Sequence, residues 1–248
     1  MSSQINLIKP ARLNNEEISC WFTLRNHDSV QQNKFIPGLN LGLNTDESAS
    51  VVLENRKHLL EETGISENQI AYAVQIHETA VRYVDSGGIY TDTDGFVTDK
   101  KDLALAIQVA DCAAVLCGDS KNKVIGVAHA GWRGAAGNIV PKTIQQMIAL
   151  GAEANHIHVF ISPCISLKNF EVGEEVAAEF PEEFVDRTNY SKPHVDLRAF
   201  IKKQLEYEGI KPKNIEIDDR CTIEVEEFYS YRRQKEKSGR MMGIIKLN

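Results

Sequence analysis

The sequence has no apolar run that approaches the roughly 18 residues needed to span a bilayer. Its first residues, MSSQINLIKPARLNNEEIS, lack the basic start and apolar block of a secretory signal peptide. We therefore expect a cytoplasmic protein with no membrane association. Basic charge is also scarce, since 28 Lys and Arg face 35 Asp and Glu for a formal net charge of -7. Nucleic acid is not an expected partner, because proteins that bind it usually carry a basic footprint.

No C-x-x-C pair occurs, which argues against a zinc finger and against a thioredoxin-type redox pair. The cysteines are odd in number and scattered: Cys20, Cys112, Cys117, Cys164 and Cys221. In a reducing compartment such cysteines are mostly buried thiols or metal ligands. Tandem repeats, low-complexity tracts and Pro/Ser-rich linkers are absent as well. A single mixed α-β domain over residues 1–248 is the simplest interpretation.

Apolar periodicity and turn residues predict alternating strands and helices along the whole chain. Strands are expected at residues 19–25, 70–76, 81–84, 96–98, 156–161, 215–217 and 243–247. The 81–84 strand is expected to be the hairpin partner of 70–76. Helices are expected at residues 48–63, 135–150, 172–180 and 197–207. A long loop, residues 26–45, contains Gly and Asn, and loops of that length are often functional.

The stretch Leu103–Gly134 contains most of the candidate catalytic and metal-binding residues. It contains two apolar strand-like runs, one followed by Ala110-Asp111-Cys112 and the other by His129-Ala130-Gly131-Trp132-Arg133-Gly134. The polar residues 119–122 predict a turn between the two runs, so they are expected to pair as antiparallel neighbours. Such a hairpin would bring Cys112 and His129 to the same end of a sheet.

A catalytic metal site is one interpretation of these clusters. Catalytic zinc usually takes three protein ligands and keeps one position open, and His77, Cys112 and His129 provide two imidazoles and a thiolate. Considered singly, each residue is more often an ordinary core or hydrogen-bonded side chain. Asp111 beside the thiol and Arg133 between glycines favour a site, since Arg suits phosphate or carboxylate recognition.

Three alternatives remain open at this level. Copper also accepts imidazole and thiolate, and His156-Ile157-His158 is a possible ligand pair for a copper oxidase. Cys112 as a nucleophile with His129 as its base would make a cysteine hydrolase. A structural zinc module would add a fourth protein ligand.

Six short motifs, taken in order, resemble the YfiH/laccase-domain family. They are Gln75-Ile76-His77, Ala110-Asp111-Cys112, His129–Gly134, Pro163-Cys164-Ile165, Cys221-Thr222 and Ser230-Tyr231-Arg232-Arg233. Members of that family were once described as polyphenol oxidases and are now regarded as purine nucleoside phosphorylases. The resemblance runs from about Trp21 to the C-terminus. It implies an α+β fold, a single-domain α-β-β-α layered sandwich with mixed sheets, and a zinc ion at His77, Cys112 and His129.

The resemblance also implies an activity. Expected substrates are inorganic phosphate and the purine nucleosides adenosine, inosine and S-methyl-5'-thioadenosine, with adenosine deamination as a side activity. The alternative is a copper-dependent polyphenol oxidase. The oligomeric state stays open.

Further site residues are predicted on this basis. Arg133 and Arg25 are assigned to anion binding, with Arg232 and Arg233 as further candidates. Asp111 and Asp94 are the candidates for proton transfer. Asn40 and Gln75 complete the predicted substrate-binding set. The chain departs from the family pattern at residues 23–28, at Ser162 and at Ala114, so loop shape and substrate preference are the properties most open to change.

Overall fold

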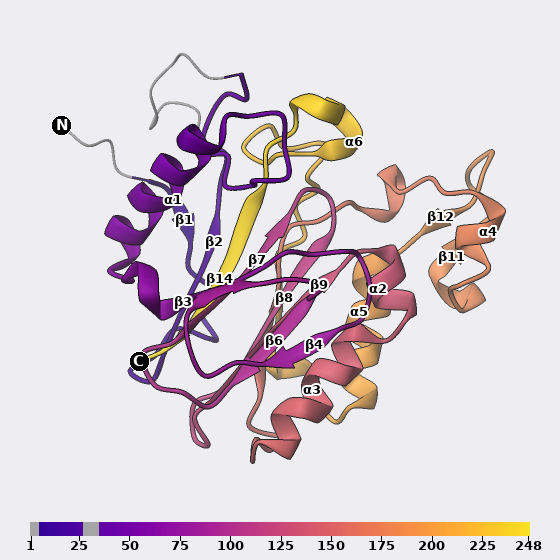
Figure 1. Cartoon of the computed structure of the whole chain (residues 1–248). Coiled ribbons are helices and arrows are strands. Elements are labelled where there is room, and N and C mark those ends of the chain that lie inside the picture. Colours follow the sequence, from indigo (N-terminus) through magenta and orange to yellow (C-terminus); the bar gives the residue numbers. More distant parts are fainter. Residues whose placement is uncertain (1–4, 27–34) are drawn as a thin grey trace.

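The computed structural model describes residues 5–26 and 35–248. Two mixed sheets lie face to face, and helices cover their outer faces (Figure 1). The first sheet has the strand order β1 (Leu7–Ile8), β2 (Ile18–Thr23), β14 (Met241–Leu247), β7 (Ala104–Val109), β3 (Ile70–Ala73) and β5 (Gly88–Tyr90). The second has the order β13 (Ile215–Ile217), β10 (His158–Ile161), β8 (Ala113–Asp119), β9 (Val124–Ala130), β6 (Gly95–Thr98) and β4 (Val81–Tyr83).

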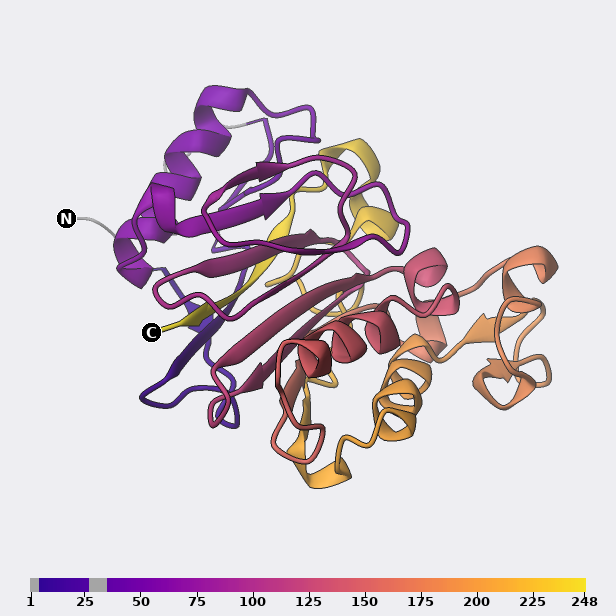
Figure 2. The same ribbon diagram turned by 60° about the horizontal axis from the view of Figure 1, so that its bottom comes forward.

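The helices form the two outer layers. Helix α1 (Ala49–Thr63) covers the first sheet, while α2 (Trp132–Ala136), α3 (Ile139–Ala149) and α5 (Leu197–Tyr207) cover the second (Figure 2). A lobe with α4 (Glu174–Ala177) and the small hairpin of β11 (Val185–Asp186) and β12 (His194–Val195) projects from the body. The short helix α6 (Tyr231–Gln234) lies above the strand ends. The predicted α-β-β-α layering is confirmed.

Three apolar clusters hold the four layers together. Phe22, Ile107 and Phe160 belong to the cluster between the two sheets. A second cluster, which includes Ile144, joins the second sheet to α3 and α5, and a third, which includes Leu59, joins the first sheet to α1. The central strands are buried on both faces, which explains why their sequences read as continuous apolar runs without alternation.

Most predicted elements exist, with shifted ends. Helix α1 begins after Ser48, whose side chain forms no capping hydrogen bond, and ends at Gly64, which is in the left-handed conformation. The predicted helix 135–150 is two helices, because Gly137 and Asn138 break it, Asn138 with a φ of +66°. The predicted helix 172–180 is reduced to α4. Residues 27–34 of the predicted long loop lie outside the described residues.

Two pairing predictions need correction. The strand 81–84 was expected to form a hairpin with 70–76, but β4 pairs in parallel with β6 in the second sheet, whereas β3 lies in the first. The apolar run before Asp111 was expected to pair with the run before His129. That run is β7, which lies in the first sheet, whereas β8 and β9 lie in the second. The predicted turn at 119–122 joins β8 to β9, and these two strands are the antiparallel pair. A short connection between two strands favours a hairpin by its length alone. Here the connections 74–80 and 110–112 cross from the first sheet to the second instead.

Among the described residues, no helix is long and apolar enough to cross a membrane.

Helix α3 offers a test of this layering. Ile144 is fully buried against the second sheet, while Ile148, one turn later, is 42% exposed. We expect Ile144→Ala to lower the free energy of unfolding by about 2–5 kcal/mol, because it leaves a cavity in the core. The control Ile148→Ala should change it by no more than about 0.5 kcal/mol. Urea unfolding followed by circular dichroism measures both, and equal losses would contradict this packing.

Candidate metal centre

Two connections between the sheets carry two of the predicted metal ligands. His77 lies on the connection from β3 to β4, and Cys112 lies on the connection from β7 to β8. Because β3 and β7 are parallel neighbours, both connections leave the first sheet at the same end. His129 reaches that end from β9, where it pairs with Ala114, two residues after Cys112.

The three side chains meet at this end. Their potential ligand atoms all lie within 4.8 Å of one another. The rings of His77 and His129 are nearly perpendicular, with centroids 4.8 Å apart. One ion can contact all three at the roughly 2.0–2.3 Å of zinc–nitrogen and zinc–sulfur bonds after small side-chain adjustments. Within the described chain, no fourth His, Cys, Asp or Glu joins this group, so the residues fit a three-ligand site.

Asp94 organises both histidines from behind. Its Oδ1 accepts a hydrogen bond from His129 Nδ1 at 2.8 Å and from the His77 backbone N–H at 3.0 Å. Its Oδ2 accepts from the backbone N–H groups of Ile76 and Glu78. The bond to Nδ1 leaves Nε2 of His129 free to bind a metal, which is the usual carboxylate–histidine–metal arrangement.

The backbone at this site is held in uncommon conformations. His77 and Asp111 have φ values of +61° and +80°, which non-glycine residues seldom adopt. Gly131 has an ordinary φ of -73°, and glycine is required there because a side chain would collide with Cys112. A Cβ at position 131 would lie 2.9 Å from Cys112 Sγ and 3.7 Å from His129 Nε2. A side chain there would occupy the space between the ligands.

The half-buried thiol of Cys112 and the buried imidazole of His129 stabilise each other as a charged pair. Burial alone raises the pKa of Cys112, but the charge and hydrogen bonds of His129, with a smaller contribution from His77, lower it to about 6. Burial alone lowers the pKa of His129, but the Cys112 charge and the hydrogen bond to Asp94 raise it to about 9. The same hydrogen bond, together with those from backbone N–H groups, outweighs the effect of burial and lowers the pKa of Asp94.

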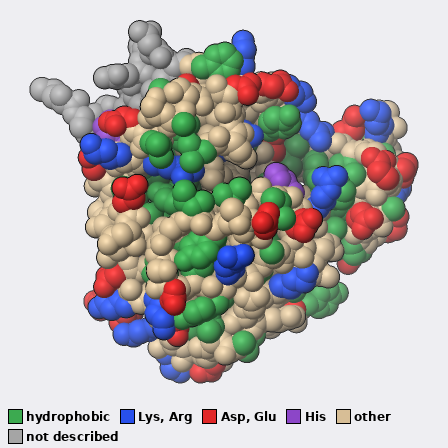
Figure 3. All heavy atoms as spheres, viewed as in Figure 1, with side chains coloured by type: hydrophobic (Ala, Val, Ile, Leu, Met, Phe, Trp, Pro, Cys, Tyr) green, Lys and Arg blue, Asp and Glu red, His purple; other side chains and the backbone are tan. Residues whose placement is uncertain are grey.

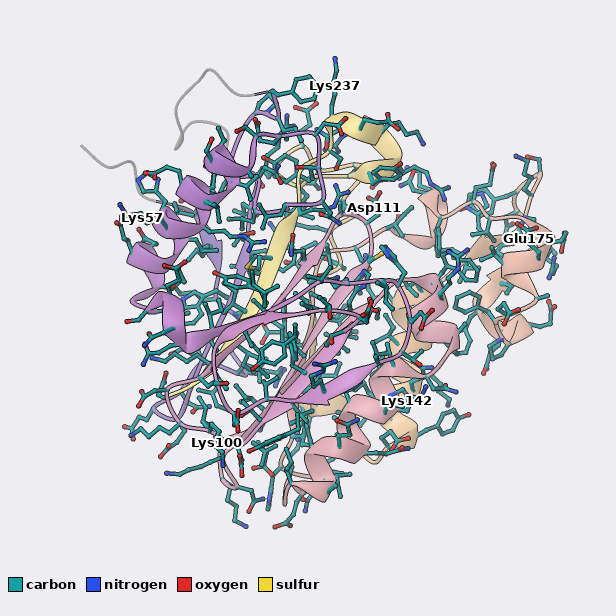
Figure 4. All side chains as sticks on the ribbon, viewed as in Figure 1. Lys57, Lys100, Asp111, Lys142, Glu175 and Lys237 are labelled. Atoms are coloured by element: carbon teal, nitrogen blue, oxygen red, sulfur yellow. The ribbon has the colours of Figure 1, made fainter. Side chains whose placement is uncertain are left out.

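Asp111 connects the site to the C-terminal part of the chain. Its carboxylate accepts hydrogen bonds from Thr222 Oγ1 at 2.6 Å and from the Arg232 backbone N–H at 2.7 Å. Its backbone carbonyl accepts a hydrogen bond from the Ile165 N–H. Figure 4 shows Asp111 between the strand ends and the segment that contains α6. Both carboxylate oxygens of Asp111 are therefore engaged in holding the structure together.

A cavity of about 640 Å³ opens onto the three ligands. Figure 3 shows a hollow on this face with hydrophobic side chains around it. Apolar residues form much of the wall, and they include Tyr72, Val109 and Phe170. Five basic residues also line it, against a single acid, Asp111: Arg56, Arg133, Arg232, Lys235 and Arg240. The volume suits a drug-sized organic ligand, and the charge suits an anion.

Half of the predicted non-ligand residues line this cavity: Arg133, Gln75, Arg232 and Asp111. Arg133 is exposed and stacks on the Trp132 ring. Gln75 exchanges two hydrogen bonds with the backbone of Gln108. One guanidinium nitrogen of Arg232 donates to the Glu171 carbonyl.

The other four predicted residues do not line the cavity. Arg25 donates to the Pro37 carbonyl and lies over the Tyr229 ring. Arg233 donates to several backbone carbonyls, among them that of Phe228. Asn40 is fully buried, and Asp94 holds the histidines.

The pair His156 and His158 lies elsewhere. His158 Nδ1 contacts the His156 carbonyl, and His156 Nδ1 lies 3.6 Å from a carboxylate oxygen of Glu153. Neither histidine lines the cavity. Among the described residues, the group of His77, Cys112 and His129 is the one set of three or more potential ligands that meet closely enough for a metal ion.

The cavity residues that sequence reasoning missed include Arg56, Tyr72, Gln108 and Arg240. A signal existed for Arg56, which lies on the apolar stripe of α1 between Val52 and Leu59, where a charged residue is unusual. Gln108 gave no signal, because it lies inside an apolar strand sequence. Its side-chain Oε1 is buried without a hydrogen-bond partner in the described structure.

Residues 19–248 match the family described as multi-copper polyphenol oxidoreductase laccase. The chain belongs to this family. A purine nucleoside phosphorylase of Corynebacterium glutamicum is 36% identical over 213 residues, which cover 83% of this chain and 85% of that protein. A purine nucleoside phosphorylase of Deinococcus radiodurans is also 36% identical, over 215 residues that cover 85% of this chain and 82% of that protein.

Solved structures of similar proteins agree with this membership. The hypothetical protein YfiH of Bacillus licheniformis superposes with a TM-score of 0.86 at 27% identity, covering 93% of both chains. A protein of Neisseria meningitidis superposes with a TM-score of 0.84 at 30% identity, covering 98% of this chain and 99% of that one. The resemblance inferred from the motifs and the layered α+β fold are both confirmed.

Replacing Asp94 tests its role in orienting the candidate metal ligands. We expect Asp94→Asn to weaken metal binding by about 10–100-fold, because His129 loses its orienting carboxylate. Asp119 is the matched control, since it is also a buried carboxylate that accepts backbone hydrogen bonds, but it lies at the opposite end of β8. Competition with a chromogenic chelator measures the affinity. If Asp119→Asn weakens binding as much as Asp94→Asn, the orienting role is contradicted.

Metal binding should also release protons in a pH-dependent way. Between pH of about 6 and about 9, the metal-free protein holds a Cys112 thiolate and a protonated His129. A metal ion needs a neutral imidazole, so at pH 7.5 each ion should displace about one proton. The number should rise below pH 6, where the thiol is also protonated, and fall to about zero above pH 9. Calorimetry in buffers of different ionisation enthalpy counts these protons, and about two released at pH 7.5 would disprove the thiolate.

Proposed function

We propose that the chain is a metal-dependent purine nucleoside phosphorylase, with its activity carried by a single domain of residues 1–248. The observation that carries the proposal is the three-ligand group of His77, Cys112 and His129 at a cavity rich in basic residues. The similarity to proteins named purine nucleoside phosphorylase supports it. The proposed substrates are adenosine, inosine and S-methyl-5'-thioadenosine with inorganic phosphate.

Zinc is the metal that best fits the donor set. Two imidazoles and one thiolate are typical of catalytic zinc, and the described residues leave a coordination position open. When bound, zinc supplies a Lewis acid and can acidify a water molecule for the proposed deamination of adenosine. Copper accepts the same donors and is the alternative.

In phosphorolysis, the apolar and the basic residues of the cavity have different roles. The apolar wall around Tyr72 and Phe170 packs against the nucleoside and excludes water, which would otherwise compete with phosphate. The basic residues hold phosphate in line with the anomeric carbon. A phosphate oxygen then bonds to that carbon as its bond to the purine nitrogen breaks, and the base leaves with the bonding electrons.

The two aspartates serve this reaction by position. Asp94 fixes the orientation of His129 and the backbone at His77, and it does not line the cavity. Asp111 lines the cavity, but Thr222 and the Arg232 backbone occupy its carboxylate. We therefore assign both residues to positioning the site rather than to proton transfer.

A copper-dependent polyphenol oxidase is the second candidate, favoured by the description of the family. Oxidases with several copper ions use several ligand groups, and the described residues bring together one. Nothing else in the cavity points to electron transfer between metal centres. The phosphorylase is therefore the stronger candidate.

The decisive experiment compares the two activities in one preparation. Protein purified without added metal is analysed for zinc and copper, then incubated with inosine or adenosine with and without phosphate. We expect free base and ribose 1-phosphate only when phosphate is present. Deamination would convert adenosine to inosine without phosphate. Stoichiometric copper with phenol oxidation and no base release would defeat the proposal.

Two cysteine variants connect the activity to the site. We expect Cys112→Ala to lose more than the roughly 10–100-fold typical of changes to residues that orient ligands, because it removes a ligand itself. Cys117→Ala is the matched control, since this fully buried thiol lies on the same strand, β8, and does not line the cavity. Base release by the two variants, each at known metal content, separates a ligand from a core thiol. Equal activity in both would remove Cys112 from the site.

A further inference from the structure

The basic residues of the cavity fall into two groups. Arg133, Arg232 and Lys235 are exposed at its mouth. Arg56 and Arg240 lie deeper, with Arg56 only 6% exposed and Arg240 half-buried. Within the described part of the chain, neither deep arginine forms an ion pair with a carboxylate. A guanidinium removed from water is costly unless it is paired, so the buried Arg56 and the half-buried Arg240 beside one cavity favour an anion there.

The topology places Arg240 next to the metal ligands. Arg240 immediately precedes β14, and Met241 at the start of β14 pairs with Val109 at the end of β7. Continuing that antiparallel register puts Arg240 opposite Ala110, two residues before Cys112. The electrostatic contacts agree, because the charge of Arg240 interacts with those of Cys112 and Asp111.

The guanidinium of Arg240 is fixed from one side only. One terminal nitrogen donates to the carbonyls of Ser238 and Gly239, at 2.8 and 3.1 Å. The group also lies 5.7 Å from the centroid of the Tyr231 ring. Since the second terminal nitrogen forms no hydrogen bond to the described residues, a planar pair of donors remains available on that side. This is the geometry with which arginine binds phosphate.

One segment of the predicted functional loop, residues 39–42, supports both deep arginines. Asn40 Oδ1 accepts from the Arg240 backbone N–H at 2.9 Å, and the Leu41 N–H donates to the Arg240 carbonyl. Arg56 Nε donates to the Leu41 carbonyl at 3.0 Å. A Cβ at Gly42 would overlap with the Arg240 side chain, so only glycine permits this close packing.

We propose that Arg240 and Arg56 together form the subsite that binds the phosphate co-substrate, and that residues 39–42 position both arginines. The inference rests on the proposed function for the identity of the anion. It moves the anion-binding role from Arg25, whose side chain lies on Pro37 and Tyr229, to Arg240. Asn40, predicted to bind substrate, becomes a positioning residue for this subsite.

Steady-state kinetics test the role of Arg240. In Arg240→Gln we expect the KM for phosphate to rise about 10- to 100-fold, because a charged hydrogen-bond donor is lost. The KM for inosine should change by less than about threefold. Arg240→Lys keeps the charge without the planar fork, so its phosphate KM should rise by less than that of Arg240→Gln. Arg82→Gln is the matched control, because Arg82 is exposed on β4 and does not line the cavity.

A binding measurement separates this inference from the proposed function. Inorganic phosphate alone, without nucleoside, should raise the Tm of the wild-type protein and of Arg82→Gln, with and without metal. The rise should be absent in Arg240→Gln at equal metal content. If the wild type shows this shift but no phosphorolysis, the phosphate subsite stands and the proposed function fails.

The opposite results would overturn the subsite. An unchanged phosphate KM together with an unchanged Tm shift in Arg240→Gln would remove Arg240 from anion binding. A rise in the inosine KM alone would assign it to the nucleoside instead. If Arg240→Gln does not fold, Arg240→Lys decides, because a phosphate KM equal to that of the wild type would contradict a planar donor pair.

Discussion

The hydrogen bond between Asp94 and His129 is the interaction on which the centre depends. One buried carboxylate, placed just before β6, accepts four hydrogen bonds, from the His129 ring and from the backbone at residues 76–78. It thereby ties the end of β9 to the connection between β3 and β4. The left-handed backbone of His77 is tolerable because these bonds over-determine it. Without them, two imidazoles on separate elements would have no common orientation.

The layered architecture explains why a cavity exists beside this bond. Two sheets packed face to face have an apolar interior, and the chain must cross from one to the other at their ends. Here two crossings, at residues 74–80 and 110–112, leave the first sheet at the same end and deliver ligands there. The rigid strands behind these crossings hold the ligands more precisely than a free loop would. The chemistry therefore lies at the rim of the core.

Features that depend on neighbouring residues alone, such as helices, turns and short motifs, could be predicted from the sequence. Apolar periodicity located α1, the polar turn at 119–122 placed the β8–β9 hairpin, and the short motifs led to the three candidate ligand positions. The sheet to which a strand belongs could not be predicted locally, because an apolar strand has the same sequence pattern in either sheet. The predicted partner of 81–84 was therefore wrong. Arg240 was missed for a similar reason, since its place beside Cys112 follows from the register of β14 against β7.

The position of β14 in the first sheet has a consequence for how the protein is made. Strand β14 lies between β2 and β7, so among the described strands the hairpin β1–β2 joins the rest of its sheet through β14 alone. During translation the first sheet stays divided until the final residues emerge. The three candidate metal ligands, His77, Cys112 and His129, are all synthesised by residue 129, long before that moment. A nascent chain thus contains the three candidate ligands before its first sheet can close, and such contacts between distant parts of a sequence make folding slow.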